Sequence, residues 1–401
     1  MRFSPSDMKP VERHLADILG TVRPLAPLEV DLERALGTVL AEDVTAPVSL
    51  PPFDNSAMDG YAVRAGDVVN VPVSLSVTED VAAGDGALRA IGSGMVARIM
   101  TGAPVPAGAD AVVPVEWTDA GRTQVTIHKQ VQPGNAIRLI GEDVRAGDVV
   151  LREGTRIGAA QLGILAGVGR RRVRVRPQPR VVVLSTGAEL AEPGTPLGPG
   201  QIWESNSFML AAAVREAGAE GFRAGAVTDD PNRFLDILDA QLLRADAVIT
   251  SGGVSMGAYE PVKEALAPLG RVVFEKVAMQ PGMPQGFGLV GDDNVPIFTL
   301  PGNPVSAFVS FVLFVRPALR QMQGLPATLP ETVRATTTAP LHSPPGRRSF
   351  LRAILTDGTV APVHGQGSHQ LAALASANAL VIVPEDVTVL AEGATVEVIP
   401  L

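Results

Sequence analysis

Three glycine-rich stretches in the middle of the 401-residue chain have residue types suited to binding a phosphorylated small molecule. They are residues 185–190 (STGAEL), 250–255 (TSGGVS) and 300–304 (LPGNP). Each follows a predicted strand, and ligands of open α/β sheets bind at the carboxyl ends of strands, where glycines let backbone N–H groups approach an anion. For any one stretch, a tight turn without a ligand is an equal alternative. Three such exits from one sheet favour a shared phosphate site.

A fourth stretch, residues 51–64 (PPFDNSAMDGYAVR), places Asp54 and Asp59 among turn-forming residues. Carboxylates in an ordered loop can hold Mg²⁺ that is bound to substrate phosphates. For either aspartate alone, an Asx turn or a helix cap is the better explanation. The functional interpretation therefore depends on the pair.

Two other phosphate and nucleophile motifs fit poorly. Residues 252–257 have the glycine spacing of a P-loop, but Ala258 stands where the phosphate-binding lysine should be. Residues 253–257 (GVSMG) also fit the G-x-S-x-G of α/β-hydrolases, with an aspartate and candidate histidines later in the chain. That serine should lie directly between strand and helix, whereas the strand is predicted to end near Thr250 and the helix to begin near Pro261. A hydrolase triad is disfavoured.

The glycine stretches must be positioned by strands and helices that alternate from Arg180 onward. The sequence predicts strands at 181–184, 247–250 and 297–300 and helices at 207–217 and 231–244. Asp230-Pro231 opens a helix with a cap and a first-turn proline, and Asn303-Pro304 repeats that device. Because strands that alternate with helices form a parallel sheet, we expect a doubly wound α/β domain from about Arg180 to Leu325.

The rest of the chain reads as two short helices and two β regions. Residues 10–20 and 157–168 have helical patterns, and we expect these helices to pair, since neither can bury its apolar face alone. Alternating apolar residues predict mostly β structure for 49–142 and again after Leu325, where Asp357-Gly358 is a hairpin signal. The apolar run at 305–315 is too short to span a membrane and predicts a buried helix.

The composition is typical of a globular protein of several domains, because 46% of the residues are hydrophobic and 19% are charged. A net charge of -9 disfavours general binding to nucleic acid or an anionic membrane, so the basic run at 170–176 is interpreted as a solvated strand or linker. The absence of cysteine excludes disulfides, thiolate zinc sites and cysteine nucleophiles and fits a reducing compartment. Because residues 1–20 lack the apolar core of a signal peptide, we expect a cytoplasmic protein.

Together with further motifs, the functional stretches closely resemble the MoeA family, the molybdopterin molybdenumtransferases. The matching motifs follow the family's order at residues 53–64, 100–104 (MTGAP), 141–143 (GED), 186–190, 251–255 and 300–305. The resemblance implies a multi-domain α/β plus β fold, with a central doubly wound α/β domain of the MogA type, an inserted mostly-β domain, a helical hinge domain and a small C-terminal domain like a β-barrel. The implied bounds are 1–48 with 143–178 for the discontinuous hinge domain, 49–142 for the inserted domain, 179–328 for the α/β domain and 329–401 for the C-terminal domain.

The activity implied by the resemblance belongs to molybdenum cofactor biosynthesis. Family members insert molybdate into adenylylated molybdopterin and release AMP, which gives molybdenum cofactor. Cleavage of the phosphoanhydride calls for a divalent cation, Mg²⁺, to offset the developing charge. The resemblance also implies an elongated homodimer, with the molybdopterin adenylyltransferase of the same pathway as a further partner.

Roles are carried over from the family to residues at matching positions. The residues with an implied catalytic role are Asp59, Thr101, Glu189, Asp229, Asp230 and Lys276. The residues implied to bind the pterin and its phosphates are Arg138, Asp143, Gly252, Gly253, Ser255, Glu260, Lys263, Pro301, Gly302, Asn303, Pro304 and Ser368. The implied Mg²⁺ ligands are Asp59, Glu189, Asp229 and Glu260. Because Asp59 and Thr101 lie in the inserted domain, the site is expected to draw on that domain as well, from the second subunit.

The sequence departs from the family pattern at positions that bear charge. Ala258 replaces an acidic residue, and Gln280 and Met283 stand where lysines are common. The missing cations weaken the local field for molybdate or phosphate, unless Arg347 and Arg348 compensate. Two alternative functions follow. One is a MoeA-like paralogue that acts as a binding scaffold, in the manner of gephyrin, and the other is the pathway's adenylyltransferase, which would need neither the inserted nor the C-terminal domain.

Overall fold

The computed structural model describes residues 8–86, 89–227, 230–253 and 261–401. The chain divides into two compact units, each described here by itself. The larger unit consists of Met1–Leu28, Gly37–Ala41 and Val175–Leu401, and the smaller unit consists of Glu29–Leu36 and Glu42–Arg174. The four implied domain bounds stay a prediction.

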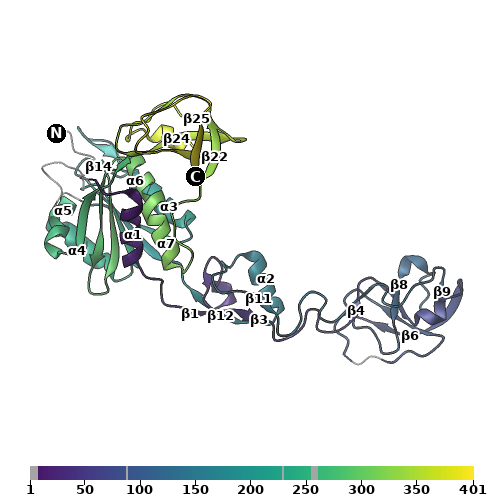
Figure 1. The fold of residues 1–401 in the computed structure, drawn as a ribbon. Coiled ribbons are helices and arrows are strands. Elements are labelled where there is room, and N and C mark those ends of the chain that lie inside the picture. The colour runs from purple at the N-terminus through teal and green to yellow at the C-terminus, as the bar shows by residue number, and fades with distance from the viewer. Residues whose placement is uncertain (1–7, 87–88, 228–229, 254–260) are drawn as a thin grey trace. The chain divides into compact units, whose positions relative to one another are not determined.

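A six-stranded sheet forms the centre of the larger unit (Figure 1). Its strands, in order across the sheet, are β16 (Glu220–Val227), β13 (Arg180–Thr186), β17 (Ala247–Ser251), β21 (Val295–Leu300), β20 (Pro284–Val290) and β18 (Val272–Lys276). The first four strands are parallel, which confirms the predicted α/β core. The two further strands were not predicted, and they are antiparallel to their neighbours, β20 to β21 and β18 to β20. The short turn from Gly291 to Asn294 joins β20 directly to β21, and so short a link permits only an antiparallel hairpin.

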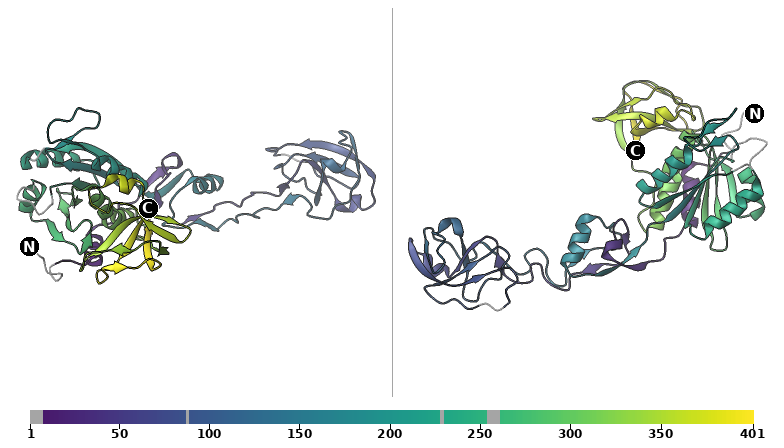
Figure 2. Two further views of the ribbon diagram at one scale, coloured as in Figure 1. Left: turned by 90° about the horizontal axis from the view of Figure 1, so that it is seen from above. Right: turned by 180° about the vertical axis from the view of Figure 1, so that it is seen from behind.

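Helices cover both faces of this sheet, as Figures 1 and 2 show. One face carries α1 (Val11–Thr21), α3 (Asn206–Glu216), α6 (Pro304–Ser310) and α7 (Arg316–Met322), and the other carries α4 (Pro231–Leu242) and α5 (Pro261–Leu266). Strand β13 shows why both faces are covered. Val181 and Val183 pack into the first layer, while Val182 and Leu184 pack into the second. A strand buried on both sides is a continuous apolar run rather than an alternating one.

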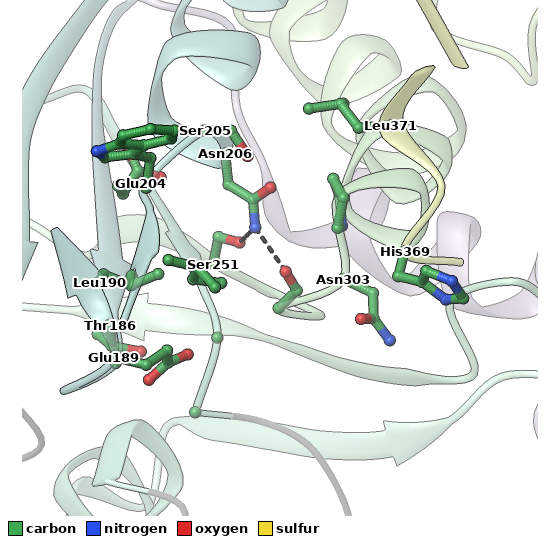
Figure 3. A pocket seen from close by; sticks show the side chains of 17 residues that line it. Thr186, Glu189, Leu190, Glu204, Ser205, Asn206, Ser251, Asn303, His369 and Leu371 are labelled. Carbon is green, nitrogen blue, oxygen red and sulfur yellow. Dashed lines mark hydrogen bonds between the residues drawn. The ribbon is translucent and has the colours of Figure 1, made fainter. Parts of the chain in front are cut away.

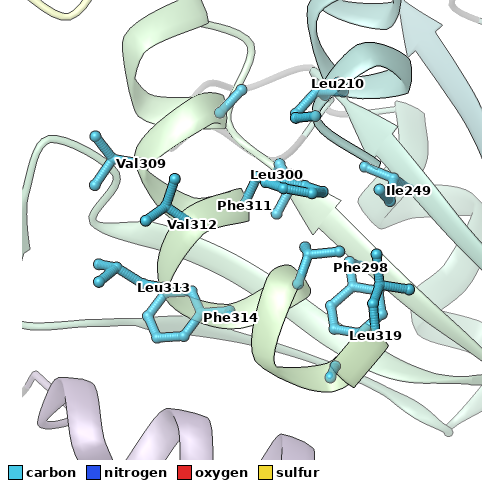
Figure 4. Packing of buried hydrophobic residues seen from close by; sticks show 14 of the residues in the cluster. Leu210, Ile249, Phe298, Leu300, Val309, Phe311, Val312, Leu313, Phe314 and Leu319 are labelled. Carbon is cyan, nitrogen blue, oxygen red and sulfur yellow. The ribbon is translucent and has the colours of Figure 1, made fainter. Parts of the chain in front are cut away.

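The helix that follows the last glycine stretch is the most apolar part of the core. It runs from Pro304 to Met322, with a π-helical segment, η6 (Phe311–Val315), between α6 and α7. Figure 4 shows Phe311 and Phe314 packed with Leu300, Phe298 and neighbouring side chains. By length and composition it is the one helix among the described residues that could cross a membrane, but 78% of its apolar stretch is buried inside the protein. The predicted buried helix is confirmed.

Helix α1 packs in this same core, so the predicted pairing of the two short helices was wrong. Val11, Leu15 and Ile18 join the cluster that contains the α6–α7 helix, and the His14 ring meets Phe314 edge-on at 4.7 Å between centroids. The other predicted helix, α2 (Ala159–Gly167), belongs to the smaller unit. A helical stripe reveals which face is buried, but it does not reveal the partner.

His14 should make the larger unit sensitive to acid. Burial lowers the pKa of His14 below its ordinary value, although the carboxylate of Glu275, 3.3 Å away, opposes the shift, and Lys9 and Asp17 complete the surrounding charges. An unfolded histidine takes up a proton near about pH 6.5, whereas the folded one resists it, so stability should be lost as the pH falls below that value.

The expected result is a larger drop in thermal midpoint between about pH 7.5 and 5.5 for the wild type than for His14→Gln, which cannot be protonated. Calorimetry at both pH values measures the difference. Equal drops in the two proteins would show that His14 does not couple to folding.

The C-terminal part of the larger unit is a closed five-stranded barrel. Its strands, in order, are β24 (Arg348–Thr356), β25 (Thr359–Pro362), β22 (Val333–Thr337), β28 (Thr395–Pro400) and β26 (Ala379–Val383), and β26 pairs back with β24. The short strand β19 (Met279–Gln280) adds to β24 in parallel. Asp357 and Gly358 have φ angles of 45° and 75°, as a two-residue hairpin turn requires, so that prediction is confirmed. This part also contains a short antiparallel pair, β23 (Leu341–His342) with β27 (Val389–Leu390). Its one short helix in the described residues, α8 (Leu371–Ala375), was not predicted.

The smaller unit contains a five-stranded β sheet, as predicted. Its strands, in order, are β8 (Ala111–Pro114), β5 (Gly60–Val63), β7 (Met95–Ile99), β6 (Val73–Val81) and β9 (Gln124–Ile127). Two short antiparallel pairs lie along the segments that lead to this sheet, namely β4 (Asn55–Ser56) with β10 (Ile137–Arg138) and β3 (Val44–Thr45) with β11 (Val149–Leu151). Strand β12 (Arg172–Arg176) pairs with β1 (Leu28–Asp31), and its last residues, Val175 and Arg176 of the larger unit, pair with β2 (Val39–Leu40) of that same unit. In β12 the side chains of Arg172 and Arg174 are exposed and Val173 is buried, which confirms the solvated strand.

Candidate functional site

The carboxyl ends of three neighbouring strands bring the glycine stretches together. Ser251 at the end of β17 lies between Ser185 of β13 and Leu300 of β21 in the sheet register. A pocket of about 640 Å³ opens at this edge, and residues of all three stretches line it. Figure 3 shows the pocket with Glu189, Asn206, Ser251, Asn303 and His369 around it. The three stretches therefore meet at one cavity, and its use as a phosphate site stays a prediction.

Gly252 allows the second stretch to lie directly against the first. Its φ is +97°, and a Cβ at this position would lie 2.6 Å from the carbonyl oxygen of Thr186. The N–H group of Gly252 donates to the carbonyl of Leu300 at 3.1 Å. Because both neighbours are backbone, no side chain could be accommodated, and the glycine is required by the close approach of three turns.

Asn206, the first residue of α3, links the second and third stretches. Its Nδ2 donates to Ser251 Oγ at 2.7 Å and to the carbonyl oxygen of Gly302 at 2.6 Å. Since that carbonyl can only accept, the orientation of the amide is fixed, and Oδ1 is left buried with no hydrogen-bond partner among the described residues. Asn206 was not among the predicted site residues, because nothing in its local sequence links it to either turn.

Glu204 fixes the first stretch to the start of α3. Its buried carboxylate accepts hydrogen bonds from Ser185 Oγ at 2.7 Å, from Ser207 N at 2.8 Å and from Ser207 Oγ at 2.5 Å. Arg223 lies 3.6 Å away on β16 and supplies the opposite charge. Glu204 was also not among the predicted site residues. Because its oxygens already accept hydrogen bonds from Ser185 and Ser207, its role is to hold the pocket wall in place.

Glu189 is the carboxylate that remains available in the pocket. It lines the cavity, and within the described part of the chain its side chain has no hydrogen bond or ion pair. The carboxylate lies against Gly187, where an added Cβ would be 2.5 Å from one of its oxygens. The Oγ1 of Thr186 is a second oxygen nearby that is buried and has no partner in the described residues. The pocket therefore offers oxygen ligands to a cation, or hydrogen-bond acceptors to a ligand N–H group.

The barrel supplies the opposite wall of the pocket. His369 and Leu371 line it, and the carbonyl oxygen of Ser368 accepts a hydrogen bond from Val305 N at the start of the α6–α7 helix. Ser368 was the predicted ligand in this segment, but the side chain that reaches the pocket is that of its neighbour His369. Predicted residues of the third stretch, Gly302, Asn303 and Pro304, do line the cavity.

In the smaller unit, Asp59 and Thr101 are joined by two hydrogen bonds. The family resemblance implied that both residues serve one site, but the sequence did not show that they touch. Asp59 Oδ1 accepts from the backbone N–H of Thr101 at 2.7 Å and from its hydroxyl at 2.8 Å. The backbone and then the hydroxyl hydrogen bond of Thr101 hold the pKa of Asp59 below its ordinary value. The carboxylate is thus kept charged in an exposed loop, where it can bind a cation or orient a ligand.

Known proteins are similar to this chain over nearly its whole length. The profile described as "MoeA N-terminal region (domain I and II)" matches residues 9–169, "Probable molybdopterin binding domain" matches 182–321, and "MoeA C-terminal region (domain IV)" matches 334–401. Two proteins of Mycobacterium tuberculosis are similar over 98% of this chain. Molybdopterin molybdenumtransferase 2 is 51% identical and covered to 99%, and molybdopterin molybdenumtransferase 1 is 39% identical and covered to 98%.

The chain belongs to the MoeA family. Two solved structures of molybdopterin biosynthesis MoeA protein from Pyrococcus horikoshii have the same fold. The first is 34% identical with a TM-score of 0.82 over 98% of this chain and 99% of its own. The second is 30% identical with a TM-score of 0.78 over 98% of this chain and all of its own. The family resemblance and the fold class inferred from the motifs are confirmed.

Several residues implied by the MoeA resemblance do not line the pocket. Lys276 ends β18 at the same edge of the sheet, and its carbonyl accepts from the N–H of Lys9. The ammonium group of Lys263 lies 5.9 Å from the centre of the Phe274 ring. Neither lysine lines the pocket, nor does Pro301. Asp229, Ser255 and Glu260 lie outside the described residues.

In the smaller unit, Asp143 lines a second pocket of about 560 Å³, and Arg138 immediately precedes the segment that lines it. Arg138 pairs with Asn55 in the β10–β4 ladder, and the N–H of Asp143 donates to the carbonyl of Leu50. Asp143 lines this pocket together with Glu142. Both residues therefore belong to the same unit as Asp59, as the motif order implied.

A cationic side chain lies next to Gln280, the position where lysine is common in the family. Arg347 donates from a guanidinium nitrogen to Gln280 Oε1 at 3.3 Å, because β19 brings Gln280 beside the start of β24. No ion pair of Arg347 with an acidic side chain is found in the described part of the chain. Arg348, in contrast, is paired with Glu12 and Glu385. Of the two arginines, Arg347 is the one placed to compensate, and that compensation stays a prediction.

Asp230, an implied catalytic carboxylate, is used to cap α4. Its Oδ1 accepts from the N–H of Asn232 at 2.9 Å and, more weakly, from that of Arg233. Asparagine caps helices as well as aspartate does. For Asp230→Asn we therefore expect an unfolding free energy within about 0.5 kcal/mol of the wild type and turnover within about twofold.

Urea unfolding and an AMP-release assay measure the two quantities, with Asp230→Ala as the control that should lose about 1 kcal/mol. A stable Asp230→Asn protein that lost most of its turnover would restore a direct catalytic role to this carboxylate.

Proposed function

We propose that this protein inserts molybdate into adenylylated molybdopterin and releases AMP, giving molybdenum cofactor. The observation that carries the proposal is one pocket where three glycine turns meet beside the available carboxylate of Glu189, in a chain that matches the MoeA family throughout. Curated relatives that are up to 51% identical carry the name of this enzyme. The protein is a transferase of molybdenum cofactor biosynthesis.

The pocket has the features that a phosphorylated heterocycle needs. Its volume of about 640 Å³ lies in the usual range for small-molecule sites. The α6–α7 helix begins at Pro304 with its N-terminus at the cavity, and a helix N-terminus favours an anion. Gly252, Gly253 and Gly302 leave the backbone bare beside that end. We assign the substrate phosphates to this polar floor.

The donors in the pocket suit Mg²⁺. Glu189 offers a carboxylate, and the partnerless Thr186 hydroxyl offers a neutral oxygen. Across the described ranges there is no group of three acidic or histidine side chains that could hold a metal without substrate. Mg²⁺ is commonly bound by one or two carboxylates together with substrate phosphates. The ion would offset charge on the phosphate oxygens, with Glu189 as a protein ligand and Asp59, Asp229 and Glu260 as the further ligands implied by the family.

Glu189, Asp59 and Thr101 have separate tasks in this proposal. Glu189 positions the cation against the phosphoanhydride, and the Asp59 carboxylate, kept charged by its hydrogen bonds from Thr101, orients a cation that accompanies the incoming oxyanion. We also propose a homodimer in the cytoplasm. The family resemblance supports the dimer, and the absence of cysteine in the sequence supports the compartment.

The activity test supplies adenylylated molybdopterin, Mg²⁺ and molybdate and measures AMP together with active cofactor. We expect turnover by the wild type and a loss of about 100-fold or more in Asp59→Asn, which keeps the shape of the side chain but not its charge. Asp54→Asn, in the same loop, is the matched control. Equal turnover by wild type and Asp59→Asn would remove Asp59 from the mechanism, and no turnover by either would end the enzyme proposal.

The same preparations separate the two rival functions. A molybdopterin adenylyltransferase would consume ATP and molybdopterin, so ATP-dependent formation of adenylylated molybdopterin would favour it. A binding scaffold would do neither reaction, although it would retain the substrate in the pocket. The completeness of the match, which includes the N-terminal and C-terminal regions of the family, favours the insertion reaction.

A further inference from the structure

One wall of the pocket is apolar and open to solvent. Ile202 and Trp203 are 56% and 54% exposed, and Leu371 across the cavity is 37% exposed. The other side of the same pocket is polar, with the glycine turns and Asn206. An indole left half-exposed beside a polar floor is an amphipathic arrangement suited to a ligand with a charged part and a flat ring.

The Trp203 side chain is held in place before any ligand arrives. Strand β15 (Ile202–Trp203) pairs in parallel with β14 (Leu190–Ala191), and the indole N–H donates to the carbonyl of Thr195 at 2.9 Å. The next residue, Glu204, is buried in the hydrogen-bond network that fixes α3. Because the ring is already ordered, little conformational entropy would be lost when a ligand packs on it.

The ring of Trp203 offers an aromatic face and no free polar edge. Its single N–H group is occupied, and in the described part of the chain no aromatic ring or cation is stacked on it. The chain contains two tryptophans, and the other, Trp117 of the smaller unit, has the Lys129 ammonium 4.9 Å from its ring centre. Trp203 is therefore the tryptophan without a stacking partner among the described residues, and its ring lies in the ligand pocket.

We propose that Trp203 is the stacking platform for a planar heterocycle of the substrate. The inference rests on the proposed function, whose substrate carries two such rings, the adenine and the pterin, attached to the phosphates that the glycine turns would hold. Either ring, once its phosphate is seated on the polar floor, can extend along the wall formed by Ile202 and Trp203. Stacking of a base on an aromatic side chain typically strengthens binding by roughly 5- to 100-fold, so this wall would contribute specificity as well as affinity.

The two-tryptophan composition permits a direct test. In a Trp117→Phe protein, Trp203 is the sole tryptophan, and Trp117 has no part in the proposed site. Its fluorescence intensity, corrected for light absorption by each probe, and its lifetime are measured during titration with three probes, AMP, a 6-substituted pterin phosphate without a nucleotide, and ribose 5-phosphate. Both quantities are needed, because a ring that is stacked in the ground state lowers the intensity without changing the lifetime.

Saturable quenching by AMP would identify adenine as the stacked ring, and quenching by the pterin phosphate would identify the pterin. Ribose 5-phosphate, which has the phosphate but no ring, is expected to leave the intensity and the lifetime unchanged. Equal quenching by ribose 5-phosphate, or no saturable quenching by either ring, would overturn the proposal. For the ring that quenches, binding measured by calorimetry should weaken about tenfold in Trp203→Ala and much less in Trp203→Phe, and unchanged binding in both would also overturn it.

AMP release by the same Trp117→Phe protein distinguishes this inference from the proposed function. Turnover without quenching rejects the stacking alone. Quenching without molybdate-dependent turnover rejects the activity and leaves the stacking in place.

Discussion

Replacing Glu189 by glutamine is expected to lower AMP release by about 10²- to 10³-fold while leaving the protein folded. The carboxylate lines the pocket and has no side-chain hydrogen bond or ion pair in the described residues, so the folded protein loses no contact when its charge is removed. What is lost is the negative charge that can hold a cation against the substrate phosphates. Glutamine keeps the size and the hydrogen-bonding capacity, which isolates the effect of charge.

Glu192→Gln is the matched control for this experiment. Glu192 lies three residues further along the same segment, but it is exposed, pairs with Arg223 and does not line the pocket. We expect its turnover to stay within about twofold of the wild type. Turnover should be measured at several Mg²⁺ concentrations, since a weakened metal site is partly rescued by more metal. A Glu189→Gln protein with normal turnover would remove this carboxylate from the metal site.

Truncation of Glu204 should have the largest effect on stability, a loss of about 3 kcal/mol in the free energy of unfolding. The Glu204→Ala protein leaves the buried Ser185 hydroxyl and two donors of Ser207 without their acceptor, and it leaves Arg223 without its buried counter-charge. Because several donors lose one partner together, the penalty exceeds that of a single hydrogen bond. The three glycine turns would lose their common support at the same time.

Urea unfolding followed by Trp203 fluorescence, in the Trp117→Phe background, reports on this region and not on the smaller unit. A local reporter is needed because a chain of two units need not unfold in one step. Glu204→Gln is the control, with an expected loss of about 1 kcal/mol, since an amide oxygen still accepts from Ser185 and Ser207. A loss below about 0.5 kcal/mol in Glu204→Ala would mean that water or a rearranged neighbour replaces the carboxylate.

The features that the sequence predicted well are set by a few adjacent residues. Asp230-Pro231 begins a helix and Asp357-Gly358 turns a hairpin because the cap, the fixed proline φ and the positive φ of the turn are local properties. The meeting of the glycine stretches was also predictable, since parallel neighbouring strands end at the same edge.

The features that the sequence did not reveal depend on partners far along the chain. Asn206 binds Ser251 and Gly302, and Glu204 binds Ser185 and Arg223, through side chains whose local surroundings look like an ordinary helix start. Helix α1 was assigned to the wrong partner for the same reason, because its apolar stripe shows a buried face but not what covers it. The position of Arg347 beside Gln280 likewise depends on a contact between segments that are far apart in the sequence.

The dependence of AMP release on molybdate tests the central claim most directly. The purified protein is given adenylylated molybdopterin and Mg²⁺, with and without molybdate, and AMP is quantified beside active cofactor, measured by reconstitution of a cofactor-free molybdoenzyme. The proposed function predicts that AMP and active cofactor appear together in equal amounts, and only when molybdate is present. AMP release at the same rate without molybdate, or release without active cofactor, would contradict molybdate insertion as the function of this protein.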